Sequence, residues 1–302
     1  MNQSLSYSTY AGWPHCLRLT NPEIELIATT DVGPRIIRFG FIGGPNEFIE
    51  YPEQQGVIES STYRSYGGHR LWAAPETQGW TNHPDNNPVA WKQDGDSVIL
   101  QPPVEPGTHL QKEIRIRLDS NRNHVHITHT ITNCHSSPQT LAPWAISVMA
   151  PGGLAILPQE VFQPHAERVL PVRPLVLWGY TQMNDPRWTW GRRFIRLRQD
   201  TRATTPQKIG ARVTAGWAAY ANGDRLFIKK FALDPEATYP DFGCNAELFT
   251  NPRMLEVESL GPLKSLQPGE SVFHEEEWHL YRGVTLGTTD EEIESALSVF
   301  HE

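Results

Sequence analysis

The sequence predicts an all-β protein, a large sandwich or barrel of antiparallel strands with a short helix near its end. The 302 residues include 25 prolines, 23 glycines and 10 tryptophans, which is the composition of a turn-rich β protein. Strand-like segments follow one another without helical segments between them, which favours antiparallel over parallel sheets. No linker or internal repeat divides the chain, so we expect one domain over residues 1–302.

The individual elements are predicted from alternation, apolar runs and turn residues. The turn Asn21-Pro22 separates the strands of a hairpin, and Leu110–Leu118 carries an apolar or long-chain residue at every second position. Asp290–Phe300 is predicted to be helical, because Thr288 or Thr289 can cap it and acidic residues fill its first turn. We predict a loop over residues 60–90 and strands at 16–20, 24–28, 35–42, 97–100, 110–118, 124–132, 144–149, 153–157, 194–197, 216–220, 225–230, 254–259 and 275–281.

Charge and cysteine usage exclude several classes of function. Only 20% of the residues are charged and the net charge is -8, without a basic cluster, which argues against binding to nucleic acid or a membrane surface. No apolar run approaches the ~20 residues of a membrane helix, and the first residues do not resemble a signal peptide. Cys16, Cys134 and Cys244 are odd in number and far apart, so we expect reduced thiols in a cytoplasmic protein.

The most informative segment is Tyr66–Glu76, with the sequence YGGHRLWAAPE. Its double glycine lets the backbone approach a ligand closely. His69 can carry a proton near neutral pH, and Arg70 offers a rigid fork of donors for anions or hydroxyls. Trp72 adds a flat aromatic face and Glu76 an acceptor, and the pair Asp85-Asn86 follows nine residues later. Polar groups beside an aromatic platform predict a sugar site.

A second informative segment contains two carboxylates, Glu256 and Glu258. In a strand they point to the same side, with Leu255 and Val257 packed behind them. Two neighbouring carboxylates repel each other, which raises one pKa and suits that group to proton transfer. A solvated strand face is the alternative, although the apolar neighbours and the exit at Gly261-Pro262 favour an interior strand.

Two further patterns leave alternatives open. The aromatic stretch Trp178–Gly191 either walls a sugar site or forms a loop packed on the core. His124 and His126 share one strand face as a possible metal pair. However, neither a carboxylate nor a third histidine follows at ligand spacing nearby, so a solvated face is favoured and no metal or other cofactor is predicted. The absence of GxSxG, P-loop and GxGxxG motifs gives no support to serine-hydrolase or nucleotide chemistry.

Several segments, in an order that spans nearly the whole chain, carry a family resemblance. They are Gly33-Pro-Arg-Ile36, Asn46-Glu-Phe48, Gly67-Gly-His-Arg-Leu-Trp72 with Pro75-Glu76, Leu255-Glu-Val-Glu258, Leu266-Gln-Pro-Gly-Glu270 and Glu277-Trp-His-Leu280. With them the chain resembles the galactose mutarotase-like superfamily, which includes the aldose 1-epimerases and hexose-6-phosphate 1-epimerases. It looks most like an uncharacterised bacterial branch, the domain of unknown function DUF4380. The resemblance implies a β-supersandwich with a sugar site on its concave face and no cofactor.

The resemblance also implies roles for individual residues. In the epimerases a glutamate takes the proton of the anomeric hydroxyl and a histidine protonates the ring oxygen. Glu256 or Glu258 matches the glutamate, while His69 matches the histidine unless Asp85-Asn86 takes that place. The sequence departs from the family at Trp144, where a histidine is expected. The residues expected to bind substrate are Arg35, Asn46, Arg70, Trp72, Glu76, Asp85, Asn86 and Trp144.

Three functions are compatible with these residues and with the resemblance. The favoured one is an aldose 1-epimerase-like enzyme acting on a small sugar or sugar derivative by Glu/His acid–base catalysis. A carbohydrate-binding protein without catalysis is the second, because a fold alone does not fix a function. A lyase or hydrolase is the third, with hydrolysis requiring a pair of carboxylates such as Glu76 and Glu258.

Overall fold

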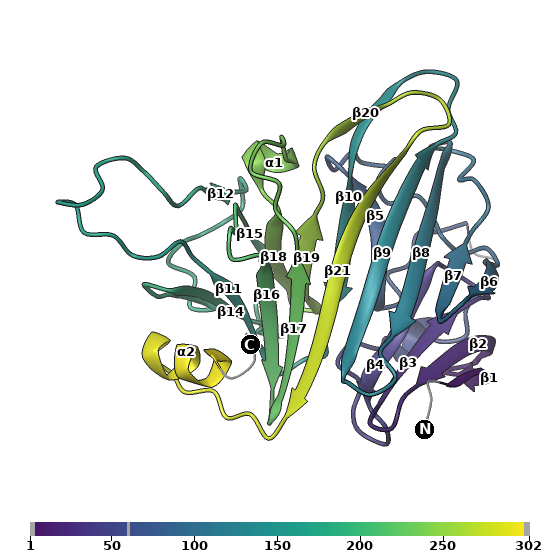
Figure 1. The fold of residues 1–302 in the computed structure, drawn as a ribbon, viewed down its shortest axis with the longest axis horizontal. Coiled ribbons are helices and arrows are strands. Elements are labelled where there is room, and N and C mark those ends of the chain that lie inside the picture. Colours follow the sequence, from purple (N-terminus) through teal and green to yellow (C-terminus); the bar gives the residue numbers. More distant parts are fainter. Residues whose placement is uncertain (1–3, 59–60, 299–302) are drawn as a thin grey trace.

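The computed structural model describes residues 4–58 and 61–298, and its strands form two antiparallel sheets (Figure 1). The strand order of the first sheet is β1 (Ser4–Tyr10), β2 (Trp13–Thr20), β3 (Ile24–Thr29), β4 (Arg35–Phe41), β5 (Gly68–Ala74), β10 (Gln139–Val148), β19 (Met254–Leu260), β18 (Ala246–Asn251), β15 (Gln207–Ala211) and β12 (Leu175–Leu177), with β20 (Lys264–Leu266) paired to β10. The second sheet has the order β13 (Trp188–Trp190), β14 (Phe194–Arg198), β11 (Leu154–Pro158), β16 (Trp217–Asn222), β17 (Arg225–Phe231), β21 (Ser271–Arg282), β9 (His124–Asn133), β8 (Leu110–Leu118), β7 (Ser97–Gln101) and β6 (Ala90–Asp94). The predicted all-β class is confirmed.

Alternation and turn chemistry explain why these segments become strands. In β8 buried and half-buried residues alternate over Leu110–Leu118, and the predicted bounds are confirmed. The hairpin of β2 and β3 is also confirmed. Its turn is fixed by the Oδ1 of Asn21, which accepts hydrogen bonds from the backbone N–H groups of Glu23 at 2.9 Å and Ile24 at 2.8 Å.

The predicted loop over residues 60–90 is wrong in its middle, because Gly68–Ala74 forms the central strand β5. The reason lies in the glycine that begins the strand. Gly68 has a φ of +73°, and a Cβ there would meet the carbonyl oxygen of Ile36 at 2.4 Å. A side chain at this position would therefore block the approach of β5 to β4. The double glycine serves strand packing in addition to any role near a ligand.

The core lies between the two sheets and is centred on aromatic rings from both. Trp278 of β21 packs with its ring centroid 5.5 Å from Phe39, 5.5 Å from Phe48 and 5.6 Å from Phe227. All four side chains are fully buried. Burying one such side chain contributes on the order of 1.5–3 kcal/mol, so this cluster is a principal contact between the sheets.

Helical structure is sparse among the described residues and consists of η1 (Pro52–Gln54), α1 (Pro240–Gly243) and α2 (Asp290–Ser298). The helix α2 packs Ile293 and Leu297 against Phe194 and Trp217, on the side of the second sheet away from the core (Figure 1). Its start is capped as predicted, because the N–H of Glu292 donates to the Oγ1 of Thr289 at 3.2 Å. Residues 299 and 300, which the prediction included, lie outside the described residues. No helix in the described part of the chain is long and apolar enough to cross a membrane, and all three cysteines are free, as predicted.

Candidate functional site

Strand alternation sorts the residues of β5, β10 and β19 onto two faces of the first sheet. Arg70 pairs with Ile146, which pairs in turn with Glu258, so their three side chains share one face. His69 and Ser147 alternate with them and point toward the second sheet. We call the side away from the second sheet the outer face.

Two charged residues that no sequence pattern indicated join this outer face. Glu258 pairs with Glu247 of β18, and Glu256 pairs with Phe249, which pairs with Lys208 of β15. Residues opposite each other in an antiparallel pair point to the same side, so three carboxylates and a lysine come together. Nothing local in the sequence marks Lys208 or Glu247, because only the pairing of β15, β18 and β19 brings them here.

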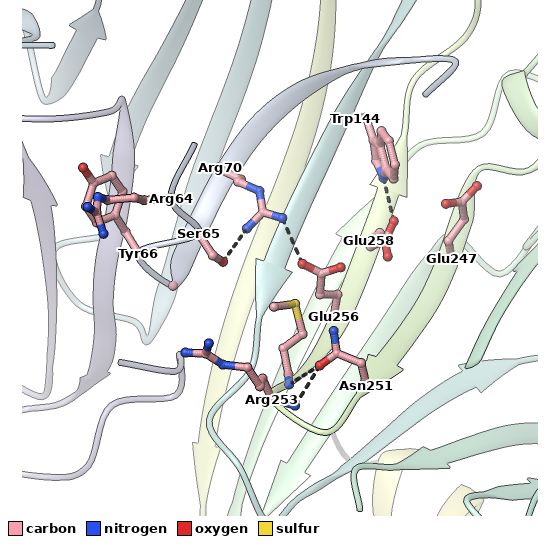
Figure 2. Close-up of polar contacts among 12 residues, drawn as sticks. Arg64, Ser65, Tyr66, Arg70, Trp144, Glu247, Asn251, Arg253, Glu256 and Glu258 are labelled. Carbon is pink, nitrogen blue, oxygen red and sulfur yellow. Dashed lines mark hydrogen bonds and ion pairs between the residues drawn. The ribbon is translucent and has the colours of Figure 1, made fainter. Parts of the chain in front are cut away.

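Glu258 is held at one oxygen and is unpartnered at the other. Its Oε2 accepts a hydrogen bond of 2.7 Å from the indole Nε1–H of Trp144 and one of 3.2 Å from Nζ of Lys208. Figure 2 shows the indole of Trp144 pointing at this carboxylate from β10. Oε1 is buried and has no hydrogen-bond partner among the described residues. A buried carboxylate oxygen without a donor is costly, which marks it as a group that can accept a proton or a ligand hydroxyl.

Lys208 is the central cation of the site. Its Nζ lies 2.7 Å from Oε2 of Glu247 and above the rings of Trp144 at 4.5 Å and Trp178 at 4.8 Å. Burial disfavours the charged ammonium, but the carboxylates of Glu247 and Glu258 outweigh burial and raise the pKa of Lys208. Burial raises the pKa of Glu247 well above its usual range, against the opposing effect of Lys208.

Glu256 forms a second ion pair beside this cluster. Nη2 of Arg70 donates to its Oε1 at 2.9 Å, and the Arg70 guanidinium lies 4.5 Å above the ring of Trp72. Burial raises the pKa of Glu256 to about 7, with Glu258 adding to the shift and Arg70 opposing it. From the sequence we expected repulsion between the two glutamates to raise one pKa. The shift is present in Glu256, although burial is its larger cause.

Aromatic side chains line this part of the outer face. The ring of Trp72 lies 5.5 Å from Trp144 and 5.8 Å from Tyr63. Burial raises the pKa of Tyr180 to about 12, and charges on Glu258 and Glu247 contribute to that shift. Sugar rings stack their apolar faces on such platforms, so the arrangement combines aromatic surface with charged hydrogen-bonding groups.

Comparison with known proteins supports the architecture. No known family model matches the chain, and no curated protein matches it. Among solved structures, a galactose mutarotase-like protein from Lactobacillus casei superimposes with a TM-score of 0.55 at 10% identity, covering 88% of this chain and 100% of the other. A galactose mutarotase related enzyme from Lactobacillus acidophilus gives 0.54 at 10% identity, with 91% and 98% covered. The protein has the galactose mutarotase-like fold.

A third solved structure, the Slr1438 protein from Synechocystis sp. PCC 6803, shares this fold with a TM-score of 0.58 at 11% identity. The alignment covers 92% of this chain and 99% of the other. The galactose mutarotase-like fold expected from the sequence is thus confirmed, while the DUF4380 branch stays a prediction. At such low identity the likeness concerns the fold, so the residues of the site must carry any functional argument.

Within the galactose mutarotase-like fold, three of the predicted residues brace the site from behind. Arg35 is fully buried and donates to Oδ1 of Asp85 at 2.9 Å and to the carbonyl of Ser65 at 2.7 Å. Ser65 in turn accepts a 3.4 Å hydrogen bond from Arg70. Asn86 donates to the carbonyl of Thr62 at 2.8 Å. These contacts hold the segment over residues 62–65 against Arg70, so Arg35, Asp85 and Asn86 position the site.

The side chain of Asn46 is engaged by the backbone, whereas Glu76 lies near Tyr180. The Asn46 side chain donates to the carbonyl of Ile37 at 3.0 Å and accepts from the N–H groups of Phe39 and Phe48, so these backbone contacts engage its amide. The structure therefore gives Asn46 a role in holding a turn. Glu76 is exposed just after β5, and its charge contributes to the raised pKa of Tyr180.

His69 does not lie beside the glutamates. It is fully buried between the sheets, with Nε2 2.7 Å from Nε2 of His129 and Nδ1 2.9 Å from Oγ of Ser147. Burial lowers its pKa well below the usual range. The expected contact of His69 with a ligand beside Glu258 is thus corrected, because a one-residue step along β5 turns its side chain to the opposite face from Arg70.

The aromatic stretch Trp178–Gly191 is divided between the candidate site and the core. Trp178 lies against Lys208 in the site. Trp188 is buried in the main core, and its indole N–H donates to Oε1 of Gln207 at 3.1 Å. One end of the stretch therefore contacts the site, and the other end packs on the core.

Proposed function

We propose that the protein is an aldose 1-epimerase-like enzyme that interconverts the anomers of a small sugar on the outer face, with Glu258 as the base. The observation that carries this proposal is the state of the Glu258 carboxylate. Trp144 and Lys208 fix one oxygen, and the second oxygen has no partner among the described residues. Such a carboxylate is held ready to accept the proton of an anomeric hydroxyl.

Glu256 supplies the complementary proton in this proposal. Its pKa of about 7 leaves it partly protonated near neutral pH, which suits a general acid. Two residues apart on one strand, Glu256 and Glu258 have backbones roughly 7 Å apart and point to the same side. This spacing allows one group to reach the anomeric hydroxyl and the other to reach the ring oxygen of the same sugar. Glu256 thereby takes the role that the resemblance implied for His69.

The reaction is balanced by these two groups alone. Glu258 removes the proton from the anomeric hydroxyl, the C1–O5 bond breaks as the C1 carbonyl forms, and Glu256 delivers its proton to O5. Rotation about C1–C2 presents the other face of the carbonyl. Closure then reverses both proton transfers, which returns each carboxyl group to its starting state. General acid and base groups contribute typically 10²–10⁴-fold each.

A carbohydrate-binding protein without catalysis is the second candidate. Two observations favour it, namely the complete burial of Glu258 and the presence of Trp144 where the epimerases carry a histidine. The aromatic platform of Trp72 and Tyr63 suits either function, because stacking on a sugar ring requires no proton transfer. Hydrolysis by Glu76 with Glu258 is a third possibility, which the same experiment tests.

Saturation-transfer NMR on a panel of aldoses, uronates and sugar phosphates separates these functions. Faster anomer exchange for one member supports the epimerase. Line broadening by binding without faster exchange contradicts the epimerase and supports the sugar-binding protein. Release of new reducing ends from an oligosaccharide supports the hydrolase instead. The panel is also needed to identify the substrate class. The cations Arg70 and Lys208 are both engaged by carboxylates of the protein, so their presence does not by itself indicate an acidic or phosphorylated sugar.

A further inference from the structure

A second cluster of polar side chains lies on the other sheet, on its face away from the core. β9 contributes His124 and His126, and β21 contributes Glu277 and His279. In the antiparallel register His126 pairs with Glu277 and His124 pairs with His279. Their neighbours Val125, Trp278 and Leu280 are buried in the main core, so the four polar side chains point away from it.

The distances within this cluster match those around a metal ion. Nε2 of His124 lies 3.6 Å from Oε2 of Glu277, and Nδ1 of His126 lies 3.5 Å from Oε1 of the same carboxylate. Nε2 of His279 lies 3.9 Å from Oε2 of Glu277. Zinc–nitrogen bonds of about 2.0–2.1 Å in a tetrahedron place neighbouring ligand atoms roughly 3.4 Å apart. We infer that His124, His126 and Glu277, with His279 packed beside them, form a binding site for a divalent cation of the zinc class.

The hydrogen bonding of the two inner histidines supports this inference independently. The His124 side chain is nine-tenths buried, and its Nε2 has no hydrogen-bond partner among the described residues. Nε2 of His279 is also buried without such a partner. Both atoms face the carboxylate of Glu277. Because native structures pair nearly all buried polar atoms, two unpartnered nitrogens converging on one carboxylate indicate a missing ligand.

Ring stacking holds the imidazole of His124 in place. The rings of His124 and His279 stack at 4.2 Å with an interplanar angle of 15°. Imidazole with one carboxylate is a donor set that suits zinc, nickel or copper better than calcium or magnesium.

The surroundings allow the ion to enter from solvent. A hollow of ≈ 380 Å³ is lined in part by His124, His279, Lys230 and Tyr281. Lys230 pairs with Glu277 across β17 and β21, and the charges of Lys230 and Arg122 reach His279. These cations oppose an incoming metal ion, so tight binding requires direct bonds from the imidazoles.

A second group of possible ligands has no need for a metal. His69, His129 and Glu276 also lie within reach of a single ion, between the sheets. There, however, Nζ of Lys229 lies 2.9 Å from Oε1 of Glu276 and supplies the positive charge. Burial disfavours the charge of Glu276, but Lys229 outweighs it and lowers the carboxyl pKa. The protein itself thus neutralises the buried group, whereas the cluster on β9 and β21 has no such internal cation bonded to Glu277 among the described residues.

The test is zinc binding by the purified, tag-free protein, measured by isothermal titration calorimetry after chelator treatment. The expected result is one Zn²⁺ per chain, with affinity lowered at least ~10-fold in His126→Asn and in Glu277→Gln. Both residues are partly exposed, with side chains 29% and 46% accessible, so these variants should fold. His165→Asn, in an exposed segment, is the matched control and should bind as the wild type does.

Two further readouts distinguish coordination from loose association. Substituted Co²⁺ should give visible d–d absorption in the wild type that is lost in His126→Asn. Zinc should also raise the unfolding temperature of the wild type and of His165→Asn but not that of Glu277→Gln, since a ligand that binds only the folded state stabilises it. Absence of stoichiometric zinc binding, or equal affinity in all four proteins, would overturn the inference. Neither result depends on the proposed sugar chemistry of the other sheet.

Discussion

The indole Nε1–H of Trp144 donates a 2.7 Å hydrogen bond to Oε2 of Glu258, between the adjacent strands β10 and β19. Trp144 stands where the family resemblance leads one to expect a histidine, and its hydrogen bond orients the Glu258 carboxylate. Lys208 shares the same oxygen. The orientation leaves the buried Oε1 of Glu258 without a hydrogen-bond partner among the described residues.

Replacing Trp144 with phenylalanine should weaken both the fold and the proposed activity. The change keeps an aromatic ring but removes the N–H, and a hydrogen bond to a charged group contributes about 1.5–3 kcal/mol. We expect a lower free energy of unfolding in urea and slower anomer exchange. Trp190→Phe is the control, because its indole donates to a backbone carbonyl away from Glu258. Equal effects of the two substitutions on anomer exchange would contradict the orienting role of Trp144.

Replacing Lys208 with methionine should be strongly destabilising. The substitution leaves the buried carboxylates of Glu247 and Glu258 without their shared cation, and removing one partner of a buried ion pair costs about 3–5 kcal/mol. Glu247→Gln in the same chain should recover part of that loss. Urea unfolding of both single variants and the double variant measures the coupling, and strictly additive losses would show that Lys208 and Glu247 do not interact.

The raised pKa of Glu256 predicts a dependence of stability on pH. Its folded-state pKa of about 7 exceeds the ordinary 4.5, so the folded protein binds this proton more tightly than the unfolded chain does. The contribution of Glu256 to stability is therefore complete below about pH 4.5 and is lost as pH rises through 7. Glu256→Gln should remove this loss. Unfolding free energies of wild type and variant between pH 4.5 and 8 should diverge, and parallel curves would contradict the shift.

Replacing His69 with asparagine separates structure from catalysis. The change disrupts contacts with His129 and Ser147 between the sheets, so we expect a loss of about 1–3 kcal/mol in the free energy of unfolding. Anomer exchange by the folded fraction should persist, because His69 faces away from Glu258. Circular dichroism fixes the folded fraction in the same samples. Complete loss of exchange in a folded His69→Asn protein would return the proton-donor role to this histidine.

Local patterns in the sequence predicted most of the strands, because alternation and turn residues occur within the strands and turns themselves. Alternation defined β8 over Leu110–Leu118, and the capping pattern at Thr289 located the start of α2. The strand β5 escaped prediction because Gly67 and Gly68 are typical of a loop, and only the close approach of Ile36 shows why glycine is needed. Such an approach involves residues distant in the chain, which no local pattern reports.

The candidate site was predictable only in part, because some of its residues follow local patterns and others are brought together by strand pairing. Period-two alternation correctly placed Glu256 and Glu258 on one side of a strand, and Arg70 came from a segment singled out for its chemistry. Lys208 and Glu247 were missed, because only the register of three strands brings them to Glu258. The same limit applies to the proposed metal cluster, whose residues on β9 and β21 are joined only by strand pairing.

The most direct test of Glu258 as the base is anomer exchange by saturation-transfer NMR in Glu258→Gln, compared with wild type on the sugar that the wild type accelerates best. Glutamine keeps the shape of the side chain but cannot accept the proton, so we expect acceleration to fall by at least ~10²-fold. Glu275→Gln, an exposed glutamate on β21, is the control and should behave as the wild type does. Loss of exchange in Glu258→Gln alone is the predicted result. Undiminished exchange in a folded Glu258→Gln protein would contradict the assignment of Glu258 as the base.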